Sequence, residues 1–259
     1  LDLERARVKT AFTSSIREQL RAKGYLDDAA LGLVLDRKEQ AEPLAPTEEL
    51  VPVDEEKLVE VLSPGGLLSE HLKGYEHRPQ QVELLRRVVQ AFNDGGQLLA
   101  EAGTGIGKSL AYLLPAIHFA VQNGRPVVVS TNTINLQDQL FQKDIPDVQR
   151  ILNLPFRAAL LKGRGNYVCQ RRLNVLRRSR QLTSTEISGL VKILAWLPQT
   201  RTGERSELLL VNDDVGVWAQ VQSSSETCIG DRCPYRQKGR CFFYRARDRA
   251  ERAHLVVVN

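Results

Sequence analysis

AGTGIGKS, residues 102–109, decides the fold of this chain. It matches the phosphate-binding loop pattern G-x-x-x-x-G-K-[ST], except that Ala102 stands at the first glycine position. Glycines let the backbone turn sharply, so that N–H groups point at a phosphate and the following helix adds its positive N-terminal end. The stretch predicts a site for ATP and Mg²⁺, and the alternative is a glycine-rich turn that binds no ligand. We expect the nucleotide to contact Ala102, Gly103, Thr104, Gly105, Ile106, Gly107, Lys108 and Ser109.

The last two residues of this stretch carry the chemistry. We expect the Lys108 ammonium to reach the β- and γ-phosphates, and the Ser109 hydroxyl to ligate Mg²⁺. These two are the predicted catalytic residues. A phosphate loop alone does not name the reaction, because many classes of nucleotide hydrolase use one.

On both sides of the loop, strands and helices alternate along the chain. The pattern predicts helices over 79–93, 108–122 and 135–142 and strands over 97–101, 126–130, 156–161 and 255–258. Strands that alternate with helices in this way form a parallel sheet that is covered on both faces. The sequence therefore predicts an α/β fold with a parallel sheet.

One long segment, residues 162–253, interrupts the alternation and holds all four cysteines. We interpret it as an insertion between two strands of the sheet. Upstream, residues 1–36 predict helices, and residues 38–52 predict a linker rich in Glu, Pro and Ala. The predicted organisation is an N-terminal region with linker (1–74), the first part of the main domain (75–161), the insertion (162–253) and a returning strand (254–259).

The four cysteines are Cys169, Cys228, Cys233 and Cys241, and the last three lie close together, with four and seven residues between them. This grouping predicts one tetrahedral site of four thiolates. Zinc and a [4Fe–4S] cluster both accept four thiolates, so spacing alone separates them poorly. Zinc sites usually pair cysteines two to four residues apart, whereas Cys169 stands alone. Unligated core cysteines are the third alternative.

Composition excludes several classes of protein. The longest apolar runs are far shorter than the roughly 20 residues that span a bilayer, and no apolar leader opens the chain. We therefore expect no membrane segment and no secretion, a cytoplasmic protein and no disulfides. The 259 residues include no Met, so we expect a fragment of a longer protein. The net charge is +5, and two basic stretches, residues 162–180 and 232–252, predict a surface for a polyanion.

Three further stretches resemble one family. YEHRPQQ (75–81) is similar to a Q motif, although a polar helix start with Pro near its first turn is the alternative. VVSTNTINLQDQL (128–140) resembles motif Ia, in which a strand ends in hydroxyl and amide side chains that can hold a nucleic-acid phosphate; a capped helix is the alternative. KGRGNYVC (162–169) precedes the other cysteines. Together with the loop, these stretches resemble the iron–sulfur branch of the superfamily 2 helicases, the DinG-type relatives of XPD.

The resemblance covers about residues 75–259 and has several implications. It implies a RecA-like first motor domain, present in part, with an inserted helical domain whose four cysteines hold a [4Fe–4S] cluster. It implies that Gln81 reads the adenine base and that Arg78 also binds the nucleotide. The implied activity is that of an ATP-dependent DNA helicase that moves 5′ to 3′. We expect it to act as a monomer on single-stranded or forked DNA. The implied nucleic-acid contacts are Thr131, Asn132, Thr133, Lys162, Arg164 and Asn166.

Some parts of such a motor do not occur in this sequence. An acidic motif for Mg²⁺ and a second motor domain are both absent, so we expect the chain to hold only the first part of the helicase core. Two other functions stay open at this point. One is a nucleic-acid-binding redox sensor with a phosphate loop, and the other is a zinc-stabilised ATPase.

Overall fold

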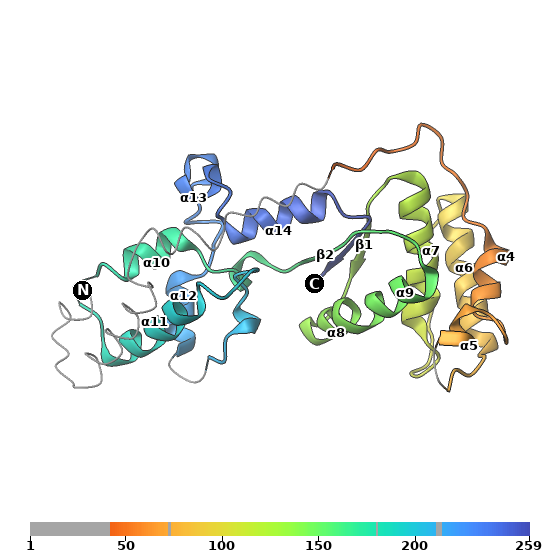
Figure 1. Cartoon of the computed structure of the whole chain (residues 1–259), viewed down its shortest axis with the longest axis horizontal. Helices are drawn as coiled ribbons and strands as arrows, with labels where there is room; N and C mark the ends of the chain where they lie inside the picture. Colours follow the sequence, from red (N-terminus) through yellow and green to blue (C-terminus); the bar gives the residue numbers. More distant parts are fainter. Residues whose placement is uncertain (1–41, 72–73, 180, 211–213) are drawn as a thin grey trace. The chain divides into compact units, whose positions relative to one another are not determined.

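The computed structural model describes residues 42–71, 74–179, 181–210 and 214–259 (Figure 1). These residues form two compact units: residues 42–161 with 249–259, and residues 162–248. The helices predicted over residues 1–36 lie outside the described residues. No helix in the described part of the chain is long and apolar enough to cross a membrane.

A parallel sheet lies at the centre of the first unit. Its strands are β1 (Val127–Ser130), β2 (Ala158–Leu161) and β3 (Leu255–Val258), in the spatial order β1-β3-β2. Leu255 of β3 pairs with Val127 on one side and with Ala158 on the other. The last strand of the chain is therefore the central one, and the predicted α/β fold with a parallel sheet is confirmed.

The strand predicted over residues 97–101 does not form, which corrects the sequence prediction. A strand needs a neighbour whose backbone groups complete its ladder. Among the described residues, β1 pairs with β3 on one side only, and no strand lies beside residues 97–101. Leu99, in the middle of this stretch, is fully exposed.

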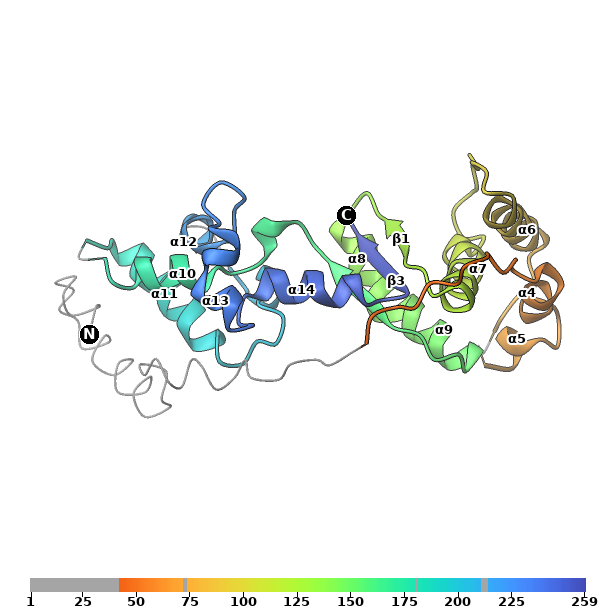
Figure 2. The ribbon, with the colours of Figure 1, turned by 90° about the horizontal axis from the view of Figure 1, so that it is seen from above.

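Helices surround the sheet of the first unit. They are α4 (Glu55–Val61), α5 (Leu67–His71), α6 (Pro79–Asp94), α7 (Lys108–Asn123), α8 (Ile134–Gln139) and α9 (Ile145–Leu152). Figures 1 and 2 agree that α7 lies between the sheet and the layer formed by α4 and α6. The helix predicted over 135–142 is longer than expected, because the π-helical turn η1 (Leu140–Asp144) joins α8 to α9 without a break.

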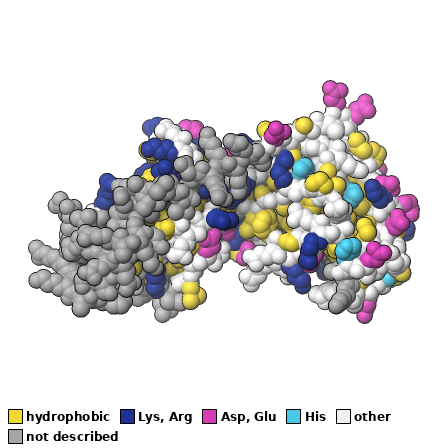
Figure 3. All heavy atoms as spheres, viewed as in Figure 1, with side chains coloured by type: hydrophobic (Ala, Val, Ile, Leu, Met, Phe, Trp, Pro, Cys, Tyr) yellow, Lys and Arg dark blue, Asp and Glu magenta, His cyan; other side chains and the backbone are white. Residues whose placement is uncertain are grey.

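The second unit is built from short helices and turns. Its elements are η2 (Arg164–Asn166), α10 (Gln170–Leu176), α11 (Ser184–Trp196), η3 (Arg205–Glu207), α12 (Asp214–Val221), η4 (Gly230–Arg232), α13 (Pro234–Gln237) and the start of α14 (Phe242–Glu251). Thr183 and Glu186 form a capping box that starts α11. Trp218, Tyr167 and Phe242 are fully buried. Figure 3 shows Lys and Arg side chains gathered around α13.

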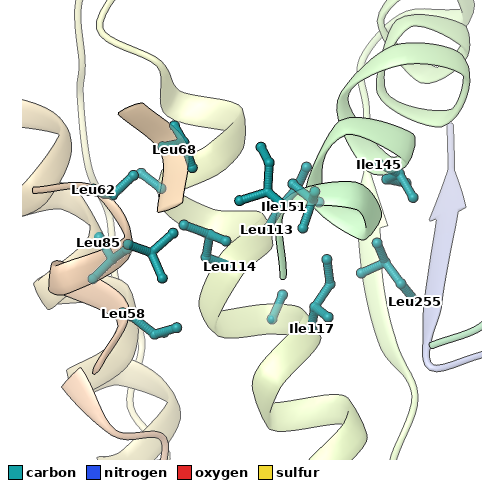
Figure 4. Packing of buried hydrophobic residues seen from close by; sticks show 14 of the residues in the cluster. Leu58, Leu62, Leu68, Leu85, Leu113, Leu114, Ile117, Ile145, Ile151 and Leu255 are labelled. Atoms are coloured by element: carbon teal, nitrogen blue, oxygen red, sulfur yellow. The ribbon is translucent and has the colours of Figure 1, made fainter. Parts of the chain in front are cut away.

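The main hydrophobic core of the first unit packs between the sheet and its helices (Figure 4). Leu255 and Val257 of β3 contribute to this core, together with α7 residues such as Leu114 and Ile117. Val256 points to the opposite face, where it packs with Ala159 and Ala250. Side chains on a strand alternate between faces, so both faces of the short sheet are covered.

Hydrogen bonds hold the segment predicted to be a linker, and the residue that follows it, against the rest of the first unit. The buried Asn123 side chain, at the end of α7, accepts a hydrogen bond from the Val51 N–H (2.7 Å) and donates to the Val51 carbonyl (3.1 Å). Asn93, near the end of α6, bonds both backbone groups of Val53 in the same way. These two asparagines therefore tie residues 51–53 to the ends of both helices.

Candidate nucleotide site and cysteine region

The phosphate loop turns sharply into α7, as the sequence predicts. Gly105 and Gly107 both have φ of +83°, a conformation that side chains other than glycine rarely adopt. Gly107 is the N-cap of α7, and Lys108 is its first residue. A Cβ atom at Gly107 would lie 2.2 Å from Nε2 of Gln81. The backbone angle therefore favours glycine at this position, and a larger residue would also displace the Gln81 amide.

The N-terminus of α6 holds the loop from the other side. The Arg78 guanidinium donates to the Gly105 carbonyl at 2.5 Å, and Gln81 Nε2 donates to the Gly107 carbonyl at 2.9 Å. Gln81 is only 2% exposed. The structure thus places the Gln81 amide against the loop backbone, and its contact with adenine stays a prediction.

The two predicted catalytic residues lie at the start of α7. Lys108 Nζ donates to the carbonyls of Ala102 (2.8 Å) and Gly103 (2.7 Å), so the ammonium lies inside the loop. Burial raises the pKa of Tyr112, and the Ser109 hydroxyl near it opposes that rise. Both side chains are therefore next to the position that a phosphate would take.

A wide hollow lies between α6 and the phosphate loop. Its volume is about 750 Å³, and its wall includes His77, Gln80 and Glu83 from the α6 region and Ala102 and Gly103 from the loop. Pockets of this size accept nucleotide-sized ligands. His77, Gln80 and Glu83 were not singled out from the sequence, because neighbouring residues of a polar helix start look alike until the loop is placed beside them.

The predicted motif Ia residues occupy the turn between β1 and α8. Thr131 is buried, and its hydroxyl donates to the carbonyls of Thr133 (3.1 Å) and Val258 (3.2 Å), which fixes the end of β1 to β3. Thr133 is the N-cap of α8 and accepts from the Leu136 N–H. Asn132 between them is exposed. Of the three residues, Asn132 and Thr133 are exposed, and Thr131 is not.

The structure places Lys162 in the interior of the second unit. Its Nζ lies 3.0 Å from Glu204 Oε2, and the two side chains are 3% and 8% exposed. Ser206 Oγ lies 3.3 Å from the same ammonium, and the Lys162 N–H donates to the Tyr167 hydroxyl. This geometry supports a structural ion pair. Sequence reasoning missed Glu204, because it is 42 positions away and carries no local signal.

The other two predicted nucleic-acid contacts lie in η2. The Arg164 guanidinium lies over the Phe243 ring at 4.1 Å from its centroid, and its charge acts to lower the pKa of Cys228. Asn166 Nδ2 donates to the Gly163 carbonyl at 3.1 Å. Both side chains thus have partners within the second unit.

All four cysteines are free thiols in the second unit. The described residues include no group of three or more His, Cys, Asp or Glu side chains placed to hold a metal ion. Burial raises the pKa of Cys241; backbone hydrogen bonds from Tyr244 and Phe243 oppose this rise, and repulsion from Cys169 and Cys233 adds to it. Burial also acts to raise the pKa of Cys228, but a backbone hydrogen bond from Gly230 and the nearby Arg164 outweigh it and lower the pKa.

Comparison with known proteins places these features in a class. A family model described as DEAD/DEAH box helicase matches residues 78–194. The match starts at the Arg78 that supports the phosphate loop, and it includes the loop, motif Ia and part of the second unit. Together with the parallel sheet, it identifies a helicase domain of this class.

Individual relatives narrow the class further. The chain is 37% identical over 206 residues to "ATP-dependent DNA helicase YoaA" of Haemophilus influenzae, which covers 79% of this chain and 31% of the relative. It is 40% identical over 210 residues to "ATP-dependent helicase DinG" of Mycobacterium tuberculosis (73% and 31%) and 34% identical over 200 residues to "3'-5' exonuclease DinG" of Bacillus subtilis (74% and 20%). The chain belongs to the DinG/YoaA-type superfamily 2 helicases. It spans about a third or less of the length of these relatives.

Proposed function

We propose that this chain is the part of an ATP-dependent DNA helicase that binds the nucleotide. The observation that carries the proposal is the phosphate loop, which is held in its turn by Arg78 and Gln81 and leads directly into α7. The names of the DinG and YoaA relatives support the reaction class. The activity belongs to the full-length protein.

Different residues of the loop bind different parts of ATP and its Mg²⁺ ion. Backbone N–H groups of the loop and the positive end of α7 hold the β-phosphate. Lys108 exchanges its two loop carbonyls for phosphate oxygens and neutralises charge on the transferring group. The Ser109 hydroxyl ligates Mg²⁺, and the hollow beside α6 is open to the base and ribose.

Replacement of Lys108 tests this proposal. In the full-length protein, Lys108→Ala should abolish ATP hydrolysis and leave single-stranded DNA binding largely intact, because only the phosphate contact is lost. Lys143→Ala, which removes an exposed lysine of η1, is the matched control and should hydrolyse ATP at the parental rate. Hydrolysis by Lys108→Ala at near the parental rate would show that the loop is not the catalytic site.

The second part of the proposal is that Cys169, Cys228, Cys233 and Cys241 hold a [4Fe–4S] cluster. Four thiolates are a complete ligand set for such a cluster. All four cysteines are free and lie in one unit. The nearby Arg164 charge acts to lower the pKa of Cys228, which favours the thiolate that a ligand needs. When bound, the cluster would supply a structural core and a one-electron redox centre.

Iron and acid-labile sulfide, measured per chain, test the ligand set. Each single Cys→Ser variant should lose most or all of the cluster, because a hydroxyl is a poor substitute for a soft thiolate. Nucleotide binding should survive, since the phosphate loop is in the other unit. Parental iron content in any variant removes that cysteine from the site. If the parental protein is colourless and contains zinc, the four cysteines form a zinc site and the cluster proposal is wrong.

We further propose movement in the 5′ to 3′ direction on single-stranded DNA, which rests on the resemblance to DinG-type helicases alone. Duplexes with a single 5′ tail or a single 3′ tail test it directly. The full-length protein should unwind the first and leave the second paired. Unwinding of only the 3′-tailed duplex would reverse the proposed direction.

A further inference from the structure

The second unit contains a cavity that none of the assignments above uses. It lies among α10, α11 and α13 and has a volume of about 470 Å³. Its floor is apolar and consists of the buried side chains Leu173, Leu194 and Leu197. We call it the α13 pocket. The volume is within the range of cavities that hold small ligands.

The rim of the α13 pocket is basic. Arg178, Lys238 and Arg240 line it, and no Asp or Glu is among the described residues that do so. Three cations around one opening attract an anionic ligand.

One aromatic ring and two amides complete the lining. Tyr235 is in the wall, and its hydroxyl accepts a hydrogen bond from Asn174 Nδ2, which fixes the ring relative to α10. Gln170 contributes a second amide. Amide side chains can donate to and accept from the edge of a nucleic-acid base, and an aromatic face can stack on the base.

We propose that the α13 pocket binds one nucleotide of single-stranded DNA. The base lies on the leucine floor against Tyr235, with its edge toward the two amides, and the 5′-phosphate lies between the rim cations. An apolar surface beside three cations fits a nucleotide better than an acidic peptide, whose charged side chains would leave the floor uncovered. The inference rests on the proposed function, because it assumes that DNA is the partner.

A comparison of two oligonucleotides tests the base contact. The full-length protein is titrated with a dye-labelled oligo-dT and with an abasic oligonucleotide of the same length, and anisotropy gives the two Kd values. Tyr235→Ala should weaken oligo-dT binding about tenfold, as expected for the loss of one stacked base, and should not change abasic binding. Tyr235→Phe keeps the ring and should retain most of the affinity. An equal loss on both oligonucleotides, or no loss on either, would overturn the base pocket.

A charge variant tests the phosphate contact without disturbing the interior. Lys238→Gln removes an exposed rim cation and should weaken both oligonucleotides several-fold, with a salt dependence about one ion shallower. Arg201→Gln removes an exposed cation of the same unit that does not line the pocket, and it should show neither effect. Equal effects of the two variants would mean that the rim acts only through overall charge, which contradicts the proposal.

Further arms identify the source of the ligand and separate two kinds of failure. If poly-glutamate displaces oligo-dT from the parental protein but not from Tyr235→Ala, the pocket binds an acidic peptide instead. If free dTMP displaces oligo-dT from the parental protein but not from Tyr235→Ala, the pocket is a site for a free mononucleotide. If the parental protein binds no single-stranded DNA, the proposed function fails. If it binds DNA and the pocket variants bind as tightly, only this inference fails.

Iron content is measured in each variant as a control for loss of the proposed cluster, because the pocket residues Gln170 and Pro234 directly follow Cys169 and Cys233.

Discussion

The buried pair Lys162–Glu204 separates a structural role for Lys162 from the DNA contact that its motif implies. Nζ and Oε2 are 3.0 Å apart, and both side chains are more than nine-tenths buried. Removal of one partner from such a pair leaves an uncompensated buried charge, which typically costs about 3–5 kcal/mol. We therefore expect Glu204→Leu and Lys162→Met each to destabilise the second unit by about that amount.

The expected shift is large enough to measure in the unit itself. One kcal/mol moves the Tm of a small domain by roughly 4–8 °C, so each single variant should melt at least about 12 °C lower. The chain has two Trp residues, Trp196 and Trp218, and both are in the second unit with their rings packed edge to face. Their fluorescence therefore follows the unfolding of this unit alone.

The double variant and a DNA titration complete the test. Lys162→Met combined with Glu204→Leu should recover most of the lost stability, because an apolar pair of similar volume needs no compensating charge. Lys192→Met, an exposed lysine of α11, is the control and should change the Tm little. A Lys162→Met variant with parental stability and much weaker binding to single-stranded DNA would refute the structural role and support the contact that the motif implies.

Four further outcomes are expected. Gly107→Ala should lower ATP affinity at least tenfold in calorimetric titrations, because a φ of +83° disfavours alanine and its Cβ would displace the Gln81 amide; Gly96→Ala, which meets no atom within 4 Å, is the control. Gln81→Ala should weaken ATP and GTP binding alike if it acts through the loop; a loss confined to ATP would support adenine reading instead. Asn123→Ala should reduce the free energy of unfolding by about 1–3 kcal/mol in urea titrations, since the Val51 backbone groups lose their partner. Burial and the nearby Arg157 lower the pKa of His254, so the contribution of neutral His254 to the free energy of unfolding is complete above pH 6.5 and declines as the pH falls below it. His254→Asn should therefore reduce the loss of stability between pH 7.5 and 5.5. The same pH dependence of stability in the variant and the parental protein would contradict this.

The predictions from sequence succeeded where the signal is local. The start of α6 at Pro79 and of α7 at Lys108 follow from a proline at the first helical position and from the glycine loop. Leu255–Val258 is a continuous apolar run and forms a strand with those bounds. The strand predicted over residues 97–101 shows the limit, because an apolar run becomes a strand only when another strand is beside it.

The sequence by itself determined the family, the parallel sheet and the position of the phosphate loop, because each depends on residue types at short spacing. Only the tertiary structure decided what several polar side chains do. Gln81 lies against the Gly107 carbonyl, and Lys162 faces Glu204 inside the second unit. A motif specifies the type of a side chain and its place along the chain, but burial and partners depend on residues tens of positions away. For the same reason, the α13 pocket became visible only when α10, α11 and α13 were packed together.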